Sequence, residues 1–210
     1  PATGQPFIAT ADQGAYEVAS NGWVVNSATK LPYFTPTQYS FGDPNPKFNM
    51  AFINDINYKD IINFSMQWDW INGSHLYNQT REWMYRDGIH GDLEKEITIN
   101  GETGAWSAFY RGCYAEVERN GTKSYFYEDA SFLRLRNLAI AIDFSRIFHL
   151  KSVRKLQLVL TGRNLITATN YTGMDPEISS GTSNSSFDRG VDSHSMPNLR
   201  TYQTGINIGF

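Results

Sequence analysis

The stretch Arg200-Thr-Tyr-Gln-Thr-Gly-Ile-Asn-Ile-Gly-Phe210 decides how the rest of the sequence is interpreted. Even-numbered positions from Tyr202 to Phe210 carry Tyr, Thr, Ile, Ile and Phe, whereas the odd-numbered positions carry Thr, Gln, Gly, Asn and Gly. Side chains alternate across a β-strand, so one face of this strand is apolar and the other is small and polar. A soluble sheet can show this pattern, but a transmembrane barrel requires it, because lipid lies outside and a wet lumen inside.

The same alternation predicts four further strands, at 48–58, 61–71, 131–144 and 156–169, before the final strand at 199–210. In 61–71 it is clearest, because five large apolar residues share one face. Such a face needs a covering layer. The apolar positions of 131–144 change parity between Leu135 and Leu138, which predicts a β-bulge near Arg136 and Asn137.

The predicted connections are of two kinds. Lys59-Asp60-Ile61 is a three-residue turn, because Tyr58 and Ile62 must share a face, and 145–155 is a short basic turn. Residues 72–130 and 170–199 are long; within the first, Trp83 to Tyr85 predicts a short helix and 94–99 a local strand. With Phe210 in the periplasm, both short turns lie on the periplasmic side and both long loops on the extracellular side, which is typical of outer-membrane barrels.

The sequence therefore predicts an all-β fold, an antiparallel transmembrane β-barrel with long extracellular loops. Residues 1–210 are its carboxy-terminal part, in which 1–47 hold a possible sixth strand at Tyr16 to Val25 and an outer loop. Because even the smallest barrels need about eight strands, we expect the remaining strands to come from elsewhere, either from the rest of a longer polypeptide or from another subunit.

Composition excludes several classes of function. The 210 residues carry 18 basic and 21 acidic side chains without a basic block, which argues against a nucleic-acid partner. No apolar run approaches the roughly 18–20 residues of a membrane helix. The histidines show no metal-ligand spacing with one another or with Cys113, the only cysteine, and no catalytic motif is present. We therefore expect no cofactor, no metal and no enzymatic activity.

Residues 43–210 resemble the carboxy-terminal part of SusC/RagA-type TonB-dependent outer-membrane transporters. The resemblance rests on motifs in the expected order: Asp43-Pro-Asn-Pro-Lys-Phe48, Glu128-Asp-Ala-Ser-Phe-Leu-Arg-Leu-Arg-Asn-Leu138, Gly162-Arg-Asn-Leu165, Thr169-Asn-Tyr-Thr-Gly-Met-Asp-Pro-Glu177 and Met196-Pro-Asn-Leu-Arg-Thr-Tyr202. One departure is Ala139-Ile-Ala-Ile-Asp-Phe144, which lacks the tyrosine expected near its centre.

The resemblance implies a 22-stranded barrel of the bacterial cell outer membrane, with a plug domain that this chain does not contain. It implies a SusD-like surface lipoprotein as a partner, and TonB acting through the missing part. Tyr202 and Phe210 resemble the terminal signal read by the barrel-assembly machinery. The implied function is import of oligomeric nutrients, glycan or peptide, with this chain as a wall segment contacting outer-membrane lipid. The alternatives are a passive pore or a soluble β-sandwich that binds carbohydrate.

Candidate site residues fall into two groups. Lumen-facing polar residues are expected to form pairs within the barrel more often than to contact substrate: Asp69, Arg134, Arg136 and Arg163. Outer-loop candidates for ligand contact are Trp83, Tyr85, Trp106, Asp175 and Glu177. Pro176 keeps Asp175 out of the helical region, so Asp175-Pro176-Glu177 is more simply a rigid start to the loop. Trp68 and Trp70 share the parity of the lipid face and are expected in an aromatic girdle.

Overall fold

The computed structural model describes residues 14–18, 24–28, 40, 42–99, 102–105, 124–178 and 189–210. The chain divides into two compact units. The loop unit comprises Pro1–Gly42 and Tyr77–Tyr127, and the sheet unit comprises Asp43–Leu76 and Glu128–Phe210. Among the described residues, no helix is long and apolar enough to cross a membrane.

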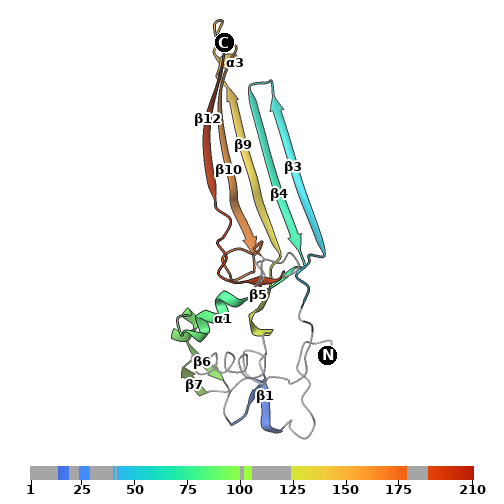
Figure 1. The fold of residues 1–210 in the computed structure, drawn as a ribbon, viewed down its shortest axis with the longest axis vertical. Coiled ribbons are helices and arrows are strands. Elements are labelled where there is room, and N and C mark those ends of the chain that lie inside the picture. Colours follow the sequence, from blue (N-terminus) through green and yellow to red (C-terminus); the bar gives the residue numbers. More distant parts are fainter. Residues whose placement is uncertain are drawn as a thin grey trace. The chain divides into compact units, whose positions relative to one another are not determined.

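The sheet unit is built on a five-stranded antiparallel sheet (Figure 1). Its spatial order, β12-β10-β9-β4-β3, follows the chain, so that each long strand pairs with the next long strand. All five strands predicted from the alternation are present: β3 Phe48–Tyr58, β4 Ile62–Asn72, β9 Phe132–Asp143, β10 Lys155–Thr169 and β12 Thr201–Gly209.

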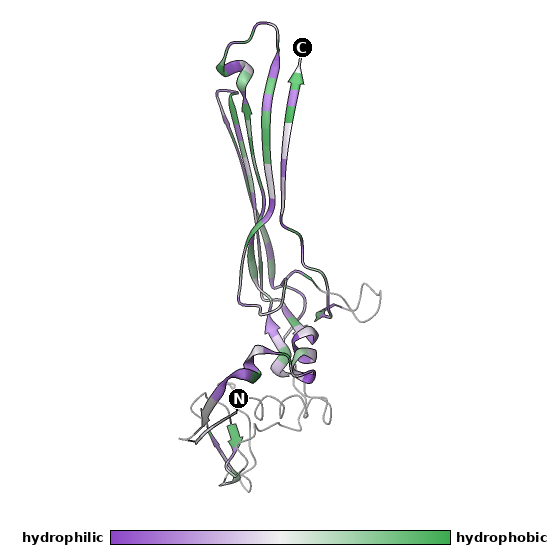
Figure 2. Ribbon diagram, turned by 90° about the vertical axis from the view of Figure 1, so that its left-hand side faces the viewer, coloured by the Kyte–Doolittle hydropathy of each residue, from purple (hydrophilic) through white to green (hydrophobic). Residues whose placement is uncertain are grey.

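Register gives this sheet one apolar face and one polar face, and along each strand the two kinds of residue alternate (Figure 2). On the apolar face, Ile62 lies opposite Ile142, which in turn lies opposite Leu158. Most of its side chains are at least partly exposed within the described residues, with Phe52 54% and Ile206 64% exposed, whereas Leu135 is buried. The apolar face is formed mainly by Phe48, Met50, Phe52, Ile56, Tyr58, Ile62, Phe64, Met66, Trp68, Trp70, Leu133, Leu135, Leu138, Ile140, Ile142, Leu156, Leu158, Leu160, Ile166, Tyr202, Ile206 and Ile208.

The predicted bulge is confirmed, and Arg136 is its extra residue. Gln67 pairs with Asn137, and the next residue, Trp68, pairs with Leu135, so Arg136 has no partner on β4. On the other side, β10 accommodates the irregularity around Asn164, whose φ is 52°. The bulge returns Leu135 and Leu138 to the same face, which explains the change of parity in the sequence.

The predicted turn at Lys59-Asp60-Ile61 is also confirmed. Lys59 and Asp60 have φ values of 53° and 55°, and the Ile61 N–H donates to the Tyr58 carbonyl oxygen at 2.9 Å. Two consecutive positive φ values are typical of a type I′ turn, whose twist suits a hairpin. The connection after β9 begins with a four-residue helix, α3 Phe144–Ile147. Figure 1 shows both short connections at the end of the sheet where the chain stops; we call this the short-turn end, and the opposite end the long-loop end.

Residues Tyr16 to Val25 differ from their prediction as a sixth strand of the barrel sheet. They hold two three-residue strands that pair antiparallel with each other, β1 Tyr16–Val18 and β2 Val24–Asn26. The expected helix and local strand in 72–130 are present as α1 Gln79–Arg86 and β6 Glu96–Ile99. The remaining strands are short: β5 His75–Asn78, β7 Glu102–Ala105, β8 Tyr127–Asp129 and β11 Val191–Asp192. Of these, β11, β5 and β8 form a three-stranded sheet, and β7 pairs with β6.

Candidate functional site

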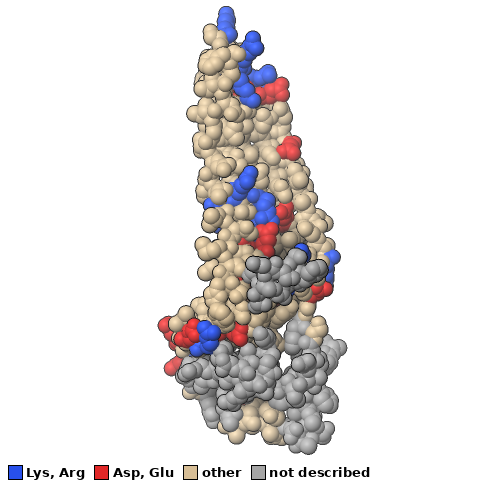
Figure 3. Space-filling view, viewed as in Figure 1, with Lys and Arg blue, Asp and Glu red and all other residues tan. Residues whose placement is uncertain are grey.

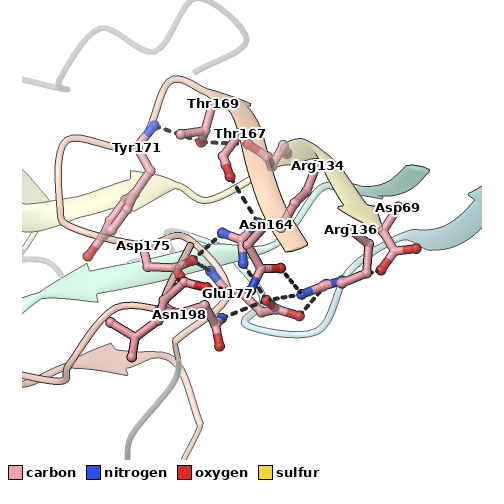
Figure 4. Close-up of polar contacts among 12 residues, drawn as sticks. Asp69, Arg134, Arg136, Asn164, Thr167, Thr169, Tyr171, Asp175, Glu177 and Asn198 are labelled. Carbon is pink, nitrogen blue, oxygen red and sulfur yellow. Dashed lines mark hydrogen bonds and ion pairs between the residues drawn. The ribbon is translucent and has the colours of Figure 1, made fainter. Parts of the chain in front are cut away.

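A group of charged side chains lies on the polar face toward the long-loop end of the sheet (Figure 4). Arg134 of β9 stands opposite Asp69 of β4, and the bulge places Arg136 beside them. The connection after β10 brings Asp175 and Glu177 onto this face. We call Asp69, Arg134, Arg136, Asp175 and Glu177 the ion network.

Arg134 is the buried centre of the ion network. Its Nη2 donates to Asp175 Oδ1 at 2.5 Å and its Nη1 to Glu177 Oε2 at 2.6 Å. Its Nε donates to Thr167 Oγ1 at 3.0 Å. The side chains of Arg134 and Asp175 are only 3% and 4% exposed. A buried ion pair resists loss of either partner, because the remaining charge would stay desolvated without compensation.

Arg136 joins the same loop to the neighbouring strand. Its Nη2 donates to Glu177 Oε1 at 2.6 Å and its Nη1 to Glu177 Oε2 at 2.9 Å, a bidentate pair. Its Nε donates to Asp69 Oδ2 on β4 at 2.7 Å. Glu177 therefore bridges two arginines, and the network holds three carboxylates against two guanidinium groups.

The network joins two separate parts of the connection between β10 and β12. Asp175 Oδ1 accepts the Glu177 N–H at 2.9 Å, and its Oδ2 accepts the Asn198 N–H, also at 2.9 Å. Burial alone would raise the pKa of Asp175, but the hydrogen bonds from Arg134 and these two backbone groups outweigh it and hold the pKa below its usual range. Asp175 is therefore an ionised anchor that ties residues 175–177 and 198 to the wall.

A second contact set fixes the start of the same loop. The Tyr171 hydroxyl donates to Asp192 Oδ2 at 2.7 Å, and its ring packs with Leu76 and Ala130 in a small buried core. The Thr172 N–H donates to Glu128 Oε2 at 2.8 Å. These contacts join the loop to β5, β8 and β11, the short strands at the long-loop end.

A cavity of about 360 Å³ lies beside the ion network. Glu177 belongs to both, and Arg189 contributes a second charged side chain to the lining. Its other walls are largely apolar, including Pro44, Ile71, Phe132 and Pro176. A cavity with apolar walls and two opposite charges suits a small organic group that carries both an apolar part and a polar part.

The structure brings five of the predicted site residues together, because both groups of candidates contribute to one network. Arg163 has the register of the polar face but is exposed and is not a member of the network. Three members of the wider contact set were missed from the sequence: Asn164, Thr167 and Asn198. Only Thr167 could have been found from the sequence, because its parity places it on the polar face. The contacts of Asn164 and Asn198 depend on the bulge and on the path of the loop.

The aromatic candidates of the loop unit are placed differently. Tyr85 is 1% exposed and packs inside that unit, where its hydroxyl donates to Asp92 Oδ2 at 2.5 Å. Burial, reinforced by this hydrogen bond, raises the pKa of Tyr85 above its usual value. Trp83 is half-buried, with the Arg86 guanidinium 4.7 Å from its ring centre. Trp106 lies outside the described residues. A ligand-contact role for these residues stays a prediction, and the burial of Tyr85 argues against such a role for that residue.

Tyr202 and Phe210, the candidates for the assembly signal, are 73% and 84% exposed. Tyr202 belongs to the apolar face, opposite Gly162 of β10. Trp68 and Trp70 also belong to this face, and the Phe48 ring meets the Trp70 ring edge-on at 4.9 Å. The two tryptophans therefore have the register expected of an aromatic girdle.

The two faces of the sheet define the class of protein. An antiparallel meander with one largely exposed apolar face and a polar face that carries a buried ion pair is typical of the wall of a transmembrane β-barrel. No protein-family model matches the chain. The TonB-dependent receptor P3 of Formosa agariphila is 31% identical over 177 residues, which are 80% of this chain and 17% of that receptor. The TonB-dependent receptor SusC of Bacteroides thetaiotaomicron is 26% identical over 88 residues, 41% of this chain and 8% of that receptor.

Solved structures show the same fold. The RagAB peptide importer in its open-open state aligns with a TM-score of 0.52 at 19% identity, covering 93% of this chain and 22% of that chain. Its closed-closed state aligns with a TM-score of 0.53 at 21% identity, covering 92% and 20%. The chain thus matches a segment of a SusC/RagA-type TonB-dependent transporter, and its sheet is part of a barrel wall. It spans less than a fifth of the length of the curated relatives it matches.

Proposed function

We propose that this chain forms part of the wall of a TonB-dependent transporter of the bacterial outer membrane. The transporter imports oligomeric nutrients, glycan or peptide, together with a SusD-like surface lipoprotein. One observation carries the proposal: five long strands present an apolar face to one side and, to the other, a network of ion pairs with a buried centre. Lipid can cover such an apolar face. A water-filled lumen on the other side can hydrate the charged side chains that are partly exposed.

The names of the similar proteins support the kind of activity. The curated relatives are named TonB-dependent receptors, and the similar solved structures are of an importer that is described as taking up peptides. None of these names describes an enzyme, in agreement with the absence of a catalytic motif from the sequence. The cavity beside Glu177 and Arg189 suits a nutrient with mixed apolar and polar groups, and peptides carry both.

The orientation follows from the same proposal. The short-turn end lies in the periplasm and the long-loop end outside, where the connection between β10 and β12 faces the SusD-like partner. Tyr202 of β12 and Phe210, which directly follows that strand, serve the barrel-assembly machinery, and TonB acts through other parts of the transporter.

Uptake by living cells tests this function. The gene for the whole transporter is deleted in frame, and uptake of fluorescent oligopeptides and oligosaccharides is compared with that of the parent strain, with and without TonB. Loss of uptake of one class, in the deletion and in the strain lacking TonB alike, is the expected result. Uptake that needs the gene but not TonB would identify a passive pore instead. Recovery of the protein in plain buffer without detergent would favour a soluble binding module.

A further inference from the structure

The connection between β9 and β10 carries an unusual concentration of positive charge. Residues 145–155, the basic turn, contain Arg146, Lys151, Arg154 and Lys155, all exposed, and no acidic residue. Figure 3 shows lysine and arginine gathered at this end of the sheet. The adjacent turn adds one charge of each sign, and its Asp60 Oδ2 lies 3.9 Å from Arg146 Nη1. A net positive charge therefore remains at the short-turn end.

Apolar side chains interrupt these charges and are equally exposed. Phe148 is 65% exposed, and Ile147 and Leu150 are each 40% exposed. Phe144 follows Ile140 and Ile142 in parity, and its ring stacks on Phe148 with the ring centres 6.0 Å apart. The apolar face of the sheet therefore continues past the end of β9 into the basic turn.

The position of these residues selects the kind of partner. A nutrient or a plug would approach the polar face, whereas Phe144 and Phe148 extend the apolar face that lipid covers. At the edge of a bilayer, apolar side chains enter the hydrocarbon boundary while long basic side chains reach the headgroups. Clusters of lysine and arginine at this level prefer anionic phospholipid.

We propose that the basic turn binds the anionic headgroup of a phospholipid in the leaflet at the short-turn end. Arg146, Lys151 and Arg154 contact the phosphate, and Phe148 and Leu150 enter the acyl boundary. The inference rests on the proposed function, which places the sheet in a bilayer, and it adds a lipid-recognition surface to that wall. Its basis is the match between a positive, acid-free turn and a negative headgroup, together with continuity of the lipid-facing surface.

Retained lipid can be counted on the whole transporter. The purified protein is mixed in detergent with equal amounts of phosphatidylglycerol, phosphatidylethanolamine and lipopolysaccharide, and bound lipids are identified by native mass spectrometry. We expect the unaltered transporter to retain phosphatidylglycerol at least about five-fold more than phosphatidylethanolamine, and R146Q/K151Q/R154Q to lower this ratio to about one. The matched variant R86Q/K95Q/R200Q removes three exposed charges elsewhere and should leave the ratio unchanged.

Two results would contradict phospholipid binding by the basic turn and leave the proposed function unaffected. One is an unchanged phosphatidylglycerol ratio in R146Q/K151Q/R154Q, provided that the variant keeps the heat-dependent gel mobility of a folded barrel. The other is a loss of bound lipopolysaccharide rather than phosphatidylglycerol, which would place the basic turn in the opposite leaflet. A protein that needs no detergent would contradict the proposed function itself.

Discussion

Arg134 is the residue on which the outer connection depends, because both acidic partners in the loop converge on it. Replacing it with methionine keeps the length of the side chain but leaves Asp175 buried and ionised without its main counter-charge. We expect R134M to lower the free energy of opening of residues 170–178 by about 3–5 kcal/mol. Hydrogen exchange of these amides in the whole transporter measures it. R163Q is the control, because Arg163 is exposed on the same face. An equal effect in R163Q would mean that the buried pair of Arg134 and Asp175 does not hold the loop more strongly than an exposed charge does.

Asp175 gives this anchor a pH dependence of known sign. Its pKa in the folded protein lies below its usual value near 4. A lowered pKa contributes stability that is fully present above the unfolded value and is lost as the pH falls through the folded value. Amides of 170–178 should therefore keep their protection from neutral pH down to about pH 4 and lose it at lower pH. In D175N this acid-induced change should disappear, although the loop is weaker throughout; protection lost already near pH 6 would point to another group.

Gly173 is required for packing of the neighbouring ring. A Cβ atom at this position would overlap the ring of Tyr171, which is buried and hydrogen-bonded to Asp192. Overpacking of this kind typically costs about 1–3 kcal/mol. We expect G173A to speed hydrogen exchange at 170–173 accordingly. G205A is the matched control, because a Cβ there meets nothing within 4 Å. Equal exchange in G173A and the parent protein would show that the ring can move aside without loss.

At the scale of elements, the turn between β3 and β4 holds removable strain. Lys59 and Asp60 both adopt positive φ, which favours asparagine and glycine over other residues. The contact from the Asp60 N–H to Asn57 Oδ1 at 2.9 Å uses the backbone and survives substitution. K59N/D60G should therefore stabilise the hairpin by about 1 kcal/mol. The urea midpoint for unfolding of the refolded barrel measures this, and a lower midpoint would mean that the side chains of the turn matter more than its backbone.

Sequence patterns predicted the elements well because parity is a local property. The length of the turn at 59–61 and the bulge at Arg136 both follow from which residues must share the apolar face. The sixth strand was wrong because alternation over Tyr16 to Val25 does not reveal that the segment folds back on itself. Local parity cannot identify the partner of a strand, and only long, uninterrupted segments make the partner predictable.

The ion network shows the opposite limit. Parity placed Arg134 and Arg136 on the polar face, as it did Asp69, but the two other carboxylates of the network, Asp175 and Glu177, lie about forty residues further along, in a loop without periodicity. The Asp175-Pro176-Glu177 segment predicted a rigid start to the loop, but it did not predict which strand the two carboxylates would contact. Tyr85 illustrates the same limit, because an aromatic residue in a polar loop can serve a ligand or the interior of the loop unit, and here it is buried.

At the scale of the whole molecule, the five-stranded sheet has two edges, β3 and β12, that pair with no further strand among the described residues. Unpaired backbone groups in a bilayer cost several kcal/mol each, so membrane strands must close into a ring.

The open edges and the uncovered apolar face lead to a test with residues 1–210 alone. Produced without the rest of the barrel, they should aggregate in buffer, and in detergent they should lack the heat-dependent gel mobility of a closed barrel. The whole transporter, refolded side by side from urea into the same detergent, should show that mobility. A monodisperse 23.8 kDa monomer in buffer would contradict the wall assignment, because so large an exposed apolar face cannot remain in water unpaired, and would favour the soluble β-sandwich.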